Sequence, residues 1–247
     1  MHTRILALVV AGALPLIASG SAAAADNPIT ANVALVSDYA YRGISQTDEK
    51  MALQGGFDYA HSSGLYVGVW GSNVSWLSDL ESGTDVNSGN SLELDIYGGY
   101  KGTIGDIGYD VGLLQYYYPG DFDSSWRGTV GLKNPNTLEG YVGLSWQVLS
   151  FKYSNSFTNL FGAPDSKGSQ YFDLSAAYEV IPGTTLNAHV GHQKIAGPGL
   201  SYTDWKVGVS QAVAGVTLGL HYVDTNMKDK SDFDADGRYV LSVAKTF

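Results

Sequence analysis

Apolar and polar residues alternate with a period of two along most of this chain. Near its end, four apolar residues fall on one face of the pattern: Tyr239, Leu241, Val243 and Phe247. Such alternation predicts a β-strand whose two faces meet different surroundings. A last strand without a partner would be an exposed sheet edge, and closing the sheet into a barrel removes that edge. We therefore expect the last strand to pair with the first.

Short turns and longer polar stretches alternate between the predicted strands. Residues 61–64 and 101–106 form short turns, whereas residues 73–90 and 119–137 form long polar stretches. Transmembrane barrels of the bacterial outer membrane have short periplasmic turns and longer extracellular loops. The sequence predicts an all-β fold, a closed antiparallel up-and-down transmembrane β-barrel of about twelve strands in residues 26–247.

The apolar face of each strand would contact lipid in such a barrel. In the first strand, which we expect to span about residues 29–43, this face is Val33, Leu35, Tyr39 and Tyr41. A soluble β-sandwich is the alternative, because it too buries one alternating face. It gives no reason for the alternation of short turns and long loops, so we favour the barrel.

The first residues have the regions of a secretory signal peptide. A basic start ending at Arg4 precedes the apolar run 5–18, and small residues follow up to Ala25. We predict a cleaved signal peptide over residues 1–25, and hence export. A membrane anchor is the alternative, but the apolar run is shorter than the ~20 residues of a spanning helix.

Composition narrows the classes of function. The chain has 24 acidic and 14 basic residues and a formal net charge of −10, which argues against a nucleic-acid partner. It has no cysteine, so thiol catalysis and cysteine metal sites are excluded. The 31 glycines and 17 tyrosines, with mean hydropathy near zero, are typical of a transmembrane barrel. We predict no cofactor.

The second face of the strands would surround the lumen. The charged residues that we predict to line a pore are Asp38, Arg42, Asp58, Glu93, Asp95, Asp110, Glu139, Lys152, Asp173, Asp204, Lys206 and Arg238. Acids outnumber bases, which predicts a modestly cation-selective, passive passage for small solutes. The alternative is that these charges pair across a filled lumen. Because barrels of about eight strands are packed and those of sixteen or more hold a channel, strand number leaves conduction open.

A loop before the last strand has part of a calcium-binding motif. Asp232, Asp234, Asp236 and Gly237 match the first half of an EF-hand loop, but Val243 occupies the position of its last glutamate. We treat this loop as a weak metal candidate beside the alternative of a solvated loop.

Histidines and serines raise the question of an outer-membrane hydrolase. On the predicted register His189 and His221 point inward and His192 points outward. The sequence has no Gly-x-Ser-x-Gly nucleophile motif. We predict that the protein is not an enzyme, and a structural or adhesive barrel that works through its loops remains the other alternative.

Several segments resemble a known family. They are residues 37–47, 54–59, 68–74, 93–100 and 117–120. They are similar to the TorF-like porins, also known as the uncharacterised Gcw_chp proteins. The resemblance implies an outer-membrane barrel of a Gram-negative bacterium with a porin role and no catalytic residues. Lys245 departs from the apolar pattern of a closing strand.

The barrel interpretation also predicts which molecules contact the protein. Its outer face would contact outer-membrane lipid and lipopolysaccharide, and its C-terminal strand would engage the barrel-assembly machinery. Small solutes would occupy its lumen.

Overall fold

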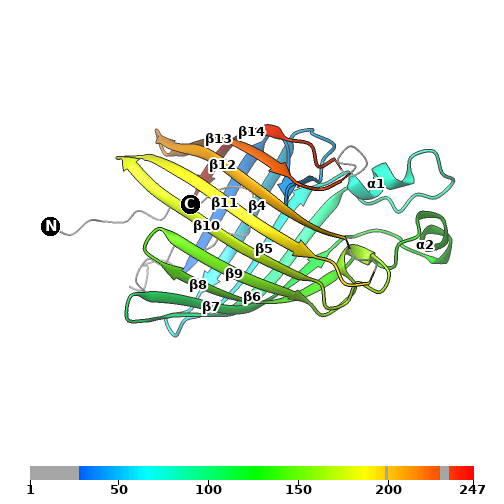
Figure 1. Ribbon diagram of the computed structural model, residues 1–247, viewed down its shortest axis with the longest axis horizontal. Coiled ribbons are helices and arrows are strands. Elements are labelled where there is room, and N and C mark those ends of the chain that lie inside the picture. Colours follow the sequence, from blue (N-terminus) through cyan, green and yellow to red (C-terminus); the bar gives the residue numbers. More distant parts are fainter. Residues whose placement is uncertain (1–27, 198–199, 229–233) are drawn as a thin grey trace.

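The strands form one closed antiparallel barrel (Figure 1). The computed structural model describes residues 28–197, 200–228 and 234–247. Within them the barrel has twelve strands: β1 (Ile29–Val36), β4 (Ala52–Ala60), β5 (Leu65–Asn73), β6 (Leu92–Ile104), β7 (Ile107–Tyr117), β8 (Thr137–Trp146), β9 (Leu149–Ser156), β10 (Gln170–Ile181), β11 (Thr184–Lys194), β12 (Ser201–Val213), β13 (Val216–Thr225) and β14 (Arg238–Thr246). The predicted fold class is confirmed, and the sandwich alternative is wrong. The predicted signal peptide lies outside the described residues.

The two ends of the barrel differ. One end, called here the turn end, carries the short turns, the start of β1 and the end of β14. The other, the loop end, carries the long connections, which contain α1 (Trp76–Glu81), α2 (Ser124–Val130) and the 3-10 helix η1 (Leu160–Gly162). Figure 1 shows α1 and α2 beyond the barrel wall at the loop end. The alternation of short and long connections is confirmed, although the sequence pattern gave no helices in these loops.

None of the helices in the described segments has the length and apolar character needed to span a membrane.

The first and last strands pair across the seam of the barrel. The ladder runs from Asn32 opposite Thr246 to Val36 opposite Ser242. This pairing confirms the expectation drawn from the C-terminal pattern. It arises because both strands carry apolar residues on the same outer face, so a shift of one residue would turn those side chains inward.

The outer face of the barrel is apolar and exposed. On β14, Tyr239 is 72% exposed and Leu241 is 59% exposed, as the alternation predicted. Large apolar side chains are exposed on the other barrel strands as well, including Phe57, Leu113 and Leu186. Soluble monomers rarely expose contiguous apolar patches above a few hundred Å². The outside of this barrel therefore has the surface chemistry of a protein surrounded by lipid.

The first strand is shorter than the sequence pattern predicts. After Val36 the chain leaves the barrel wall, and β2 (Ala40–Tyr41) pairs with β3 (Ile44–Ser45) in a separate two-stranded sheet. We call residues 37–50 the lumen hairpin, because its side chains contact the inner faces of several barrel strands. The prediction that Tyr39 and Tyr41 face lipid is wrong, since Tyr39 is only 5% exposed and both side chains bond to groups inside the barrel.

Backbone geometry explains the departure from the wall. Arg42 and Gly43 both have positive φ, 47° and 82°, which reverses the chain direction at the hairpin tip. At the hairpin base, the Ser37 hydroxyl accepts a hydrogen bond from Leu241 N at 2.9 Å and ends the seam ladder. The period of two thus continues beyond Val36, but it serves the hairpin instead of the barrel wall.

Candidate functional site in the barrel lumen

The tip of the lumen hairpin reaches the opposite wall of the barrel. Arg42 donates to both carboxylate oxygens of Glu139 on β8, at 3.0 and 2.8 Å, and to Gln193 Oε1 on β11 at 2.7 Å. Its guanidinium also lies 4.9 Å from the ring centre of Tyr41 and 4.2 Å from that of Tyr171. The Arg42 and Glu139 side chains are 7% and 3% exposed. A buried ion pair, in which Arg42 Nη2 donates to both oxygens of Glu139, therefore fixes the hairpin across the lumen.

The base of the hairpin is held at the seam. Arg238 on β14 forms an ion pair with Asp38 at 2.8 Å and a longer one with Glu49 at 3.3 Å. The same guanidinium donates to the carbonyl oxygens of Gly43 and Asp234. Burial raises the pKa of the Asp38 carboxyl above its ordinary value, and Arg238 opposes that rise. One arginine of the last strand thus holds both the base and the turn of the hairpin.

Aromatic side chains fill the lumen around the hairpin at the loop end. The Tyr39 hydroxyl donates to Glu93 Oε1 at 2.7 Å, and the Tyr118 hydroxyl donates to the other oxygen of Glu93. The hydroxyls of Tyr41 and Tyr116 lie 2.6 Å apart. Tyr116 and Tyr118 are each 2% exposed. The loop half of the lumen is therefore packed with side chains.

The turn half of the lumen keeps partly exposed charges. They are Asp58, Lys101, Asp110, Lys152, His189 and Lys206. Tyrosine hydroxyls bond two of the carboxylates, Tyr97 to Asp58 and Tyr66 to Asp110, each at 2.6 Å. These inward charges are thus less completely buried than the side chains around the hairpin.

Tyrosine rings in this half lie over inward-facing glycines of neighbouring strands. Gly68 and Tyr97 are direct ladder partners, as are Gly112 and Tyr141. A Cβ atom built on Gly68 would overlap the Tyr97 ring, and one on Gly112 would overlap the Tyr141 ring and hydroxyl. The glycines therefore let the rings lie flat against the wall, which leaves more of the lumen cross-section free.

A histidine between two carboxylates occupies the wall formed by β10, β11 and β12. His189 Nε2 lies 2.8 Å from Asp204 Oδ1, and Nδ1 lies 3.3 Å from Asp173 Oδ2. Ser175 Oγ lies 3.2 Å from Nδ1 but donates to Asp173 Oδ1 at 2.7 Å. Both ring nitrogens face carboxylate oxygens and the serine hydrogen is already used, so this arrangement provides no free general base for a nucleophile.

A family model described as "Bacterial protein of unknown function (Gcw_chp)" matches residues 21–247. The chain belongs to the Gcw_chp family. The match supports this part of the resemblance seen in the sequence, and the TorF-like part stays a prediction. A search of curated proteins found no match to this Gcw_chp chain.

Solved structures similar to the Gcw_chp barrel include outer-membrane porins and channels. The COG4313 outer membrane channel from Pseudomonas putida F1 has a TM-score of 0.55 and 12% identity, covering 91% of this chain and 97% of that chain. A KdgM porin has a TM-score of 0.54 and 9% identity, with 88% and 99% covered. A NanC porin has a TM-score of 0.51 and 11% identity, with 88% and 98% covered. At these identities the likeness shows a shared fold.

The charged residues that the sequence assigned to the lumen all lie inside the Gcw_chp barrel. Asp38 and Arg42 reach the lumen on the hairpin, which corrects their expected place on a spanning strand. His189 and His221 point inward and His192 is exposed outside, as the register predicted. Sequence reasoning did not find the role of Gln193, which contacts the hairpin tip. That these side chains line an open pore stays a prediction.

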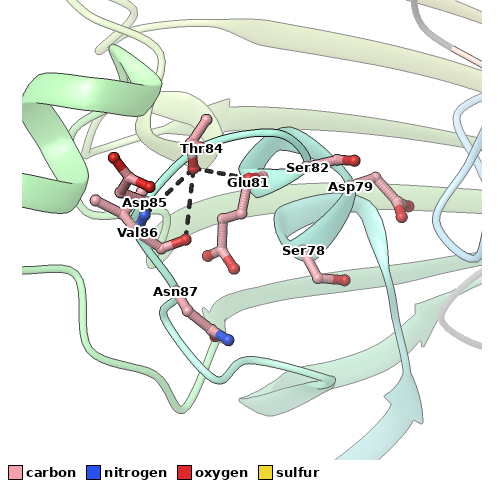
Figure 2. A pocket seen from close by; sticks show the side chains of 8 residues that line it. All are labelled: Ser78, Asp79, Glu81, Ser82, Thr84, Asp85, Val86 and Asn87. Carbon is pink, nitrogen blue, oxygen red and sulfur yellow. Dashed lines mark hydrogen bonds between the residues drawn. The ribbon is translucent and has the colours of Figure 1, made fainter.

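A surface hollow of about 500 Å³ lies outside the lumen, beside α1. Figure 2 shows the polar side chains around it, which are Ser78, Asp79, Glu81, Ser82, Thr84, Asp85 and Asn87 together with the apolar Val86. The Glu81 carboxylate accepts hydrogen bonds from Ser88 N at 2.9 Å and Trp126 Nε1 at 2.6 Å. The Glu81 carboxylate therefore links the loop that contains α1 to the loop that contains α2, and this supports a structural role for it.

The weak calcium candidate is only partly described. Asp232 lies outside the described residues. The carbonyl oxygen of Asp234 accepts hydrogen bonds from Ser45 N and Arg238, so this part of the loop supports the hairpin. No group of three or more His, Cys, Asp or Glu residues in the described segments is arranged to hold a metal ion. Calcium binding by Asp232, Asp234 and Asp236 stays a prediction.

Proposed function

We propose that the protein is an outer-membrane, porin-like barrel of a Gram-negative bacterium that gives small solutes passive passage with modest cation preference. The observation that carries this proposal is the distribution of polarity in the closed barrel. Large apolar side chains are exposed outside, and carboxylates such as Asp58 and Asp110 face the lumen. A soluble barrel would have the opposite arrangement, with apolar side chains inside.

The lumen hairpin limits the size of the solute. It fills the loop half of the lumen and is attached at both its tip and its base, so the remaining passage is narrow. The acid excess among the inward charges raises the local concentration of cations and repels anions. Small cations and small neutral molecules are therefore the expected solutes.

The same surface chemistry supports the proposed partners. The exposed apolar belt fits outer-membrane lipid and lipopolysaccharide. The exposed side of β14, with Tyr239, Leu241, Val243 and Phe247, is the segment that we propose to engage the barrel-assembly machinery.

Conductance in a planar lipid bilayer tests the passage. Purified protein is expected to give small, voltage-independent currents, with a reversal potential in a potassium chloride gradient that favours potassium. Preference for chloride would refute the cation-selective passage. If neither the wild-type protein nor a variant with a detached hairpin carries current, passage is refuted altogether.

A closed structural or adhesive barrel is the second candidate. The packed loop half of the lumen favours it, because Tyr116 and Tyr118 are almost fully buried there. This candidate predicts that the barrel carries no current. It also predicts that the structural or adhesive activity is lost when the loops containing α1 and α2 are shortened. A hydrolase is not favoured, since Ser175 and His189 are both occupied by carboxylates.

A further inference from the structure

Asp95 on β6 differs from the other inward-facing carboxylates of the predicted pore. The others each accept a hydrogen bond or form an ion pair with a lumen side chain, as described above. Asp95 is 2% exposed, and within the described residues its Oδ1 is buried without a hydrogen-bond partner. An isolated carboxylate loses the stabilisation of water without replacing it, which is costly. This position therefore lacks a positive or hydrogen-donating partner.

The neighbouring acids do not supply that partner. Glu93 lies two residues before Asp95 on the inward face of β6, and Glu139 faces the lumen from β8, so both are acids and neither is a cation. The oxygens of Glu93 already accept the hydroxyls of Tyr39 and Tyr118. Glu139 is already bound by the hairpin tip. Of the three acids, two are satisfied by the protein and one is not.

Lys152 also faces the lumen but is directed elsewhere. Its Nζ lies 4.3 Å from the ring centre of Tyr141 and, within the described residues, forms no ion pair with a carboxylate. The ladder neighbours of Asp95 are Trp70 and Tyr116, which both point inward. Neither ladder neighbour is charged, so neither provides a positive partner for Asp95.

We propose that Asp95 is the position at which a permeating monovalent cation, such as potassium, binds inside the barrel. This inference rests on the proposed function, since it names the residue that determines cation preference. A single free carboxylate suits a transient site, because an ion that permeates must bind weakly enough to leave. Tight chelation of a divalent metal is not expected, since the described residues contain no ligand group arranged for it.

Two measurements on the full barrel test the site. The first is anomalous diffraction from crystals soaked in rubidium chloride, with rubidium as the probe for a monovalent cation. An anomalous peak next to Asp95 in the wild type, absent in Asp95→Asn, is expected. The second is the reversal potential in a potassium chloride gradient, where Asp95→Asn should reduce the potassium-to-chloride permeability ratio severalfold.

Asp110→Asn is the matched control, because it removes one lumen carboxylate that already accepts a hydrogen bond from Tyr66. It should keep the rubidium peak at Asp95 and change the permeability ratio less than Asp95→Asn. If both substitutions change the permeability ratio equally, cation preference arises from the summed charge of the lumen, and the specific site at Asp95 is overturned. Both variants exchange groups of equal size, and heat-modifiable mobility on gels checks that they fold.

The outcomes separate this inference from the proposed function. A rubidium peak at Asp95 without any current would support the site and refute passage. Current in the wild type, with no rubidium peak and an unchanged ratio in Asp95→Asn, would refute the site and leave passage standing. A peak that persists in Asp95→Asn would also overturn the role of this carboxylate.

Discussion

The attachment of the hairpin tip can be tested by replacing Arg42 with alanine. The change removes both hydrogen bonds to Glu139, the bond to Gln193 and the contacts with the rings of Tyr41 and Tyr171. It also leaves Glu139 buried without its partner. Removing one member of a buried ion pair typically costs about 3–5 kcal/mol. The substitution therefore destabilises the seated hairpin relative to a displaced one, because displacement would let water reach Glu139.

The free energy converts into a change of population. Since about 1.4 kcal/mol corresponds to a factor of ten, Arg42→Ala should shift the ratio of seated to displaced hairpin by roughly a hundredfold to a few thousandfold. Displacement would open the loop half of the lumen. We expect larger single-channel currents and a higher open probability in planar bilayers, together with passage of larger neutral solutes into proteoliposomes.

A matched control lies in the same hairpin. Lys50 Nζ forms an ion pair with Asp48 at 2.7 Å, but these side chains are 73% and 46% exposed. Lys50→Ala should therefore leave the currents at the wild-type level, because exposed ion pairs contribute little. Replacing both Arg42 and Glu139 by apolar residues of similar volume should return the currents toward the wild-type level, since no buried charge is then left alone.

Two results would contradict this reasoning. Wild-type currents from Arg42→Ala would show that the tip contacts do not hold the hairpin. Equal opening by Arg42→Ala and Lys50→Ala would show that the hairpin responds to any loss of positive charge.

The barrel wall gives three further predictions. Gly68→Ala should destabilise the barrel by about 1–3 kcal/mol in urea unfolding from lipid, because the new Cβ overlaps the Tyr97 ring; unchanged stability would mean that the ring moves freely. Cysteines replacing Leu35 and Val243, which are ladder partners, should cross-link at the seam, whereas cysteines at Leu35 and Leu241 should not; the reverse result would place the seam in another register. Leu241→Arg should cost about 2–4 kcal/mol in lipid if the side chain lies near the bilayer centre, and a neutral effect in the same unfolding assay would argue against a lipid-facing β14.

The strands and their outer faces could be predicted because the barrel imposes one rule on the whole wall. Each wall strand has lipid on one side and the lumen on the other, so a period of two reports both strand and orientation. Tyr239 and Leu241 follow this rule and are exposed as expected. The pairing of β1 with β14 followed from the same rule, because a closed sheet leaves no edge.

The lumen hairpin could not be predicted in this way. Tyr39 and Tyr41 continue the alternation of β1, so their spacing is the same as that of a lipid-facing pair. Their burial depends on partners far along the chain, Glu93 and Tyr116. The local signal was the Arg42-Gly43 turn, since glycine readily adopts the positive φ of a chain reversal.

The sequence also could not predict which lumen charges form ion pairs. An inward register identifies Glu139 and Asp95 as lumen residues, but it does not show which of them meets a cation. That choice depends on where the hairpin tip ends, and Arg42 reaches Glu139. The glycine and tyrosine pairs were hidden for a similar reason, because Gly68 meets Tyr97 only once the register of β5 and β6 is known.

Arg238 links closure of the barrel to closure of the lumen. It belongs to the last strand, and its ion pair with Asp38 crosses the seam to the residues that follow β1. The same side chain binds the carbonyl of Gly43, next to the hairpin tip. These contacts require β14 to lie beside β1, so closure of the sheet also positions the anchor of the hairpin base. The C-terminal strand therefore completes the wall and also supplies the charge that holds the hairpin inside it.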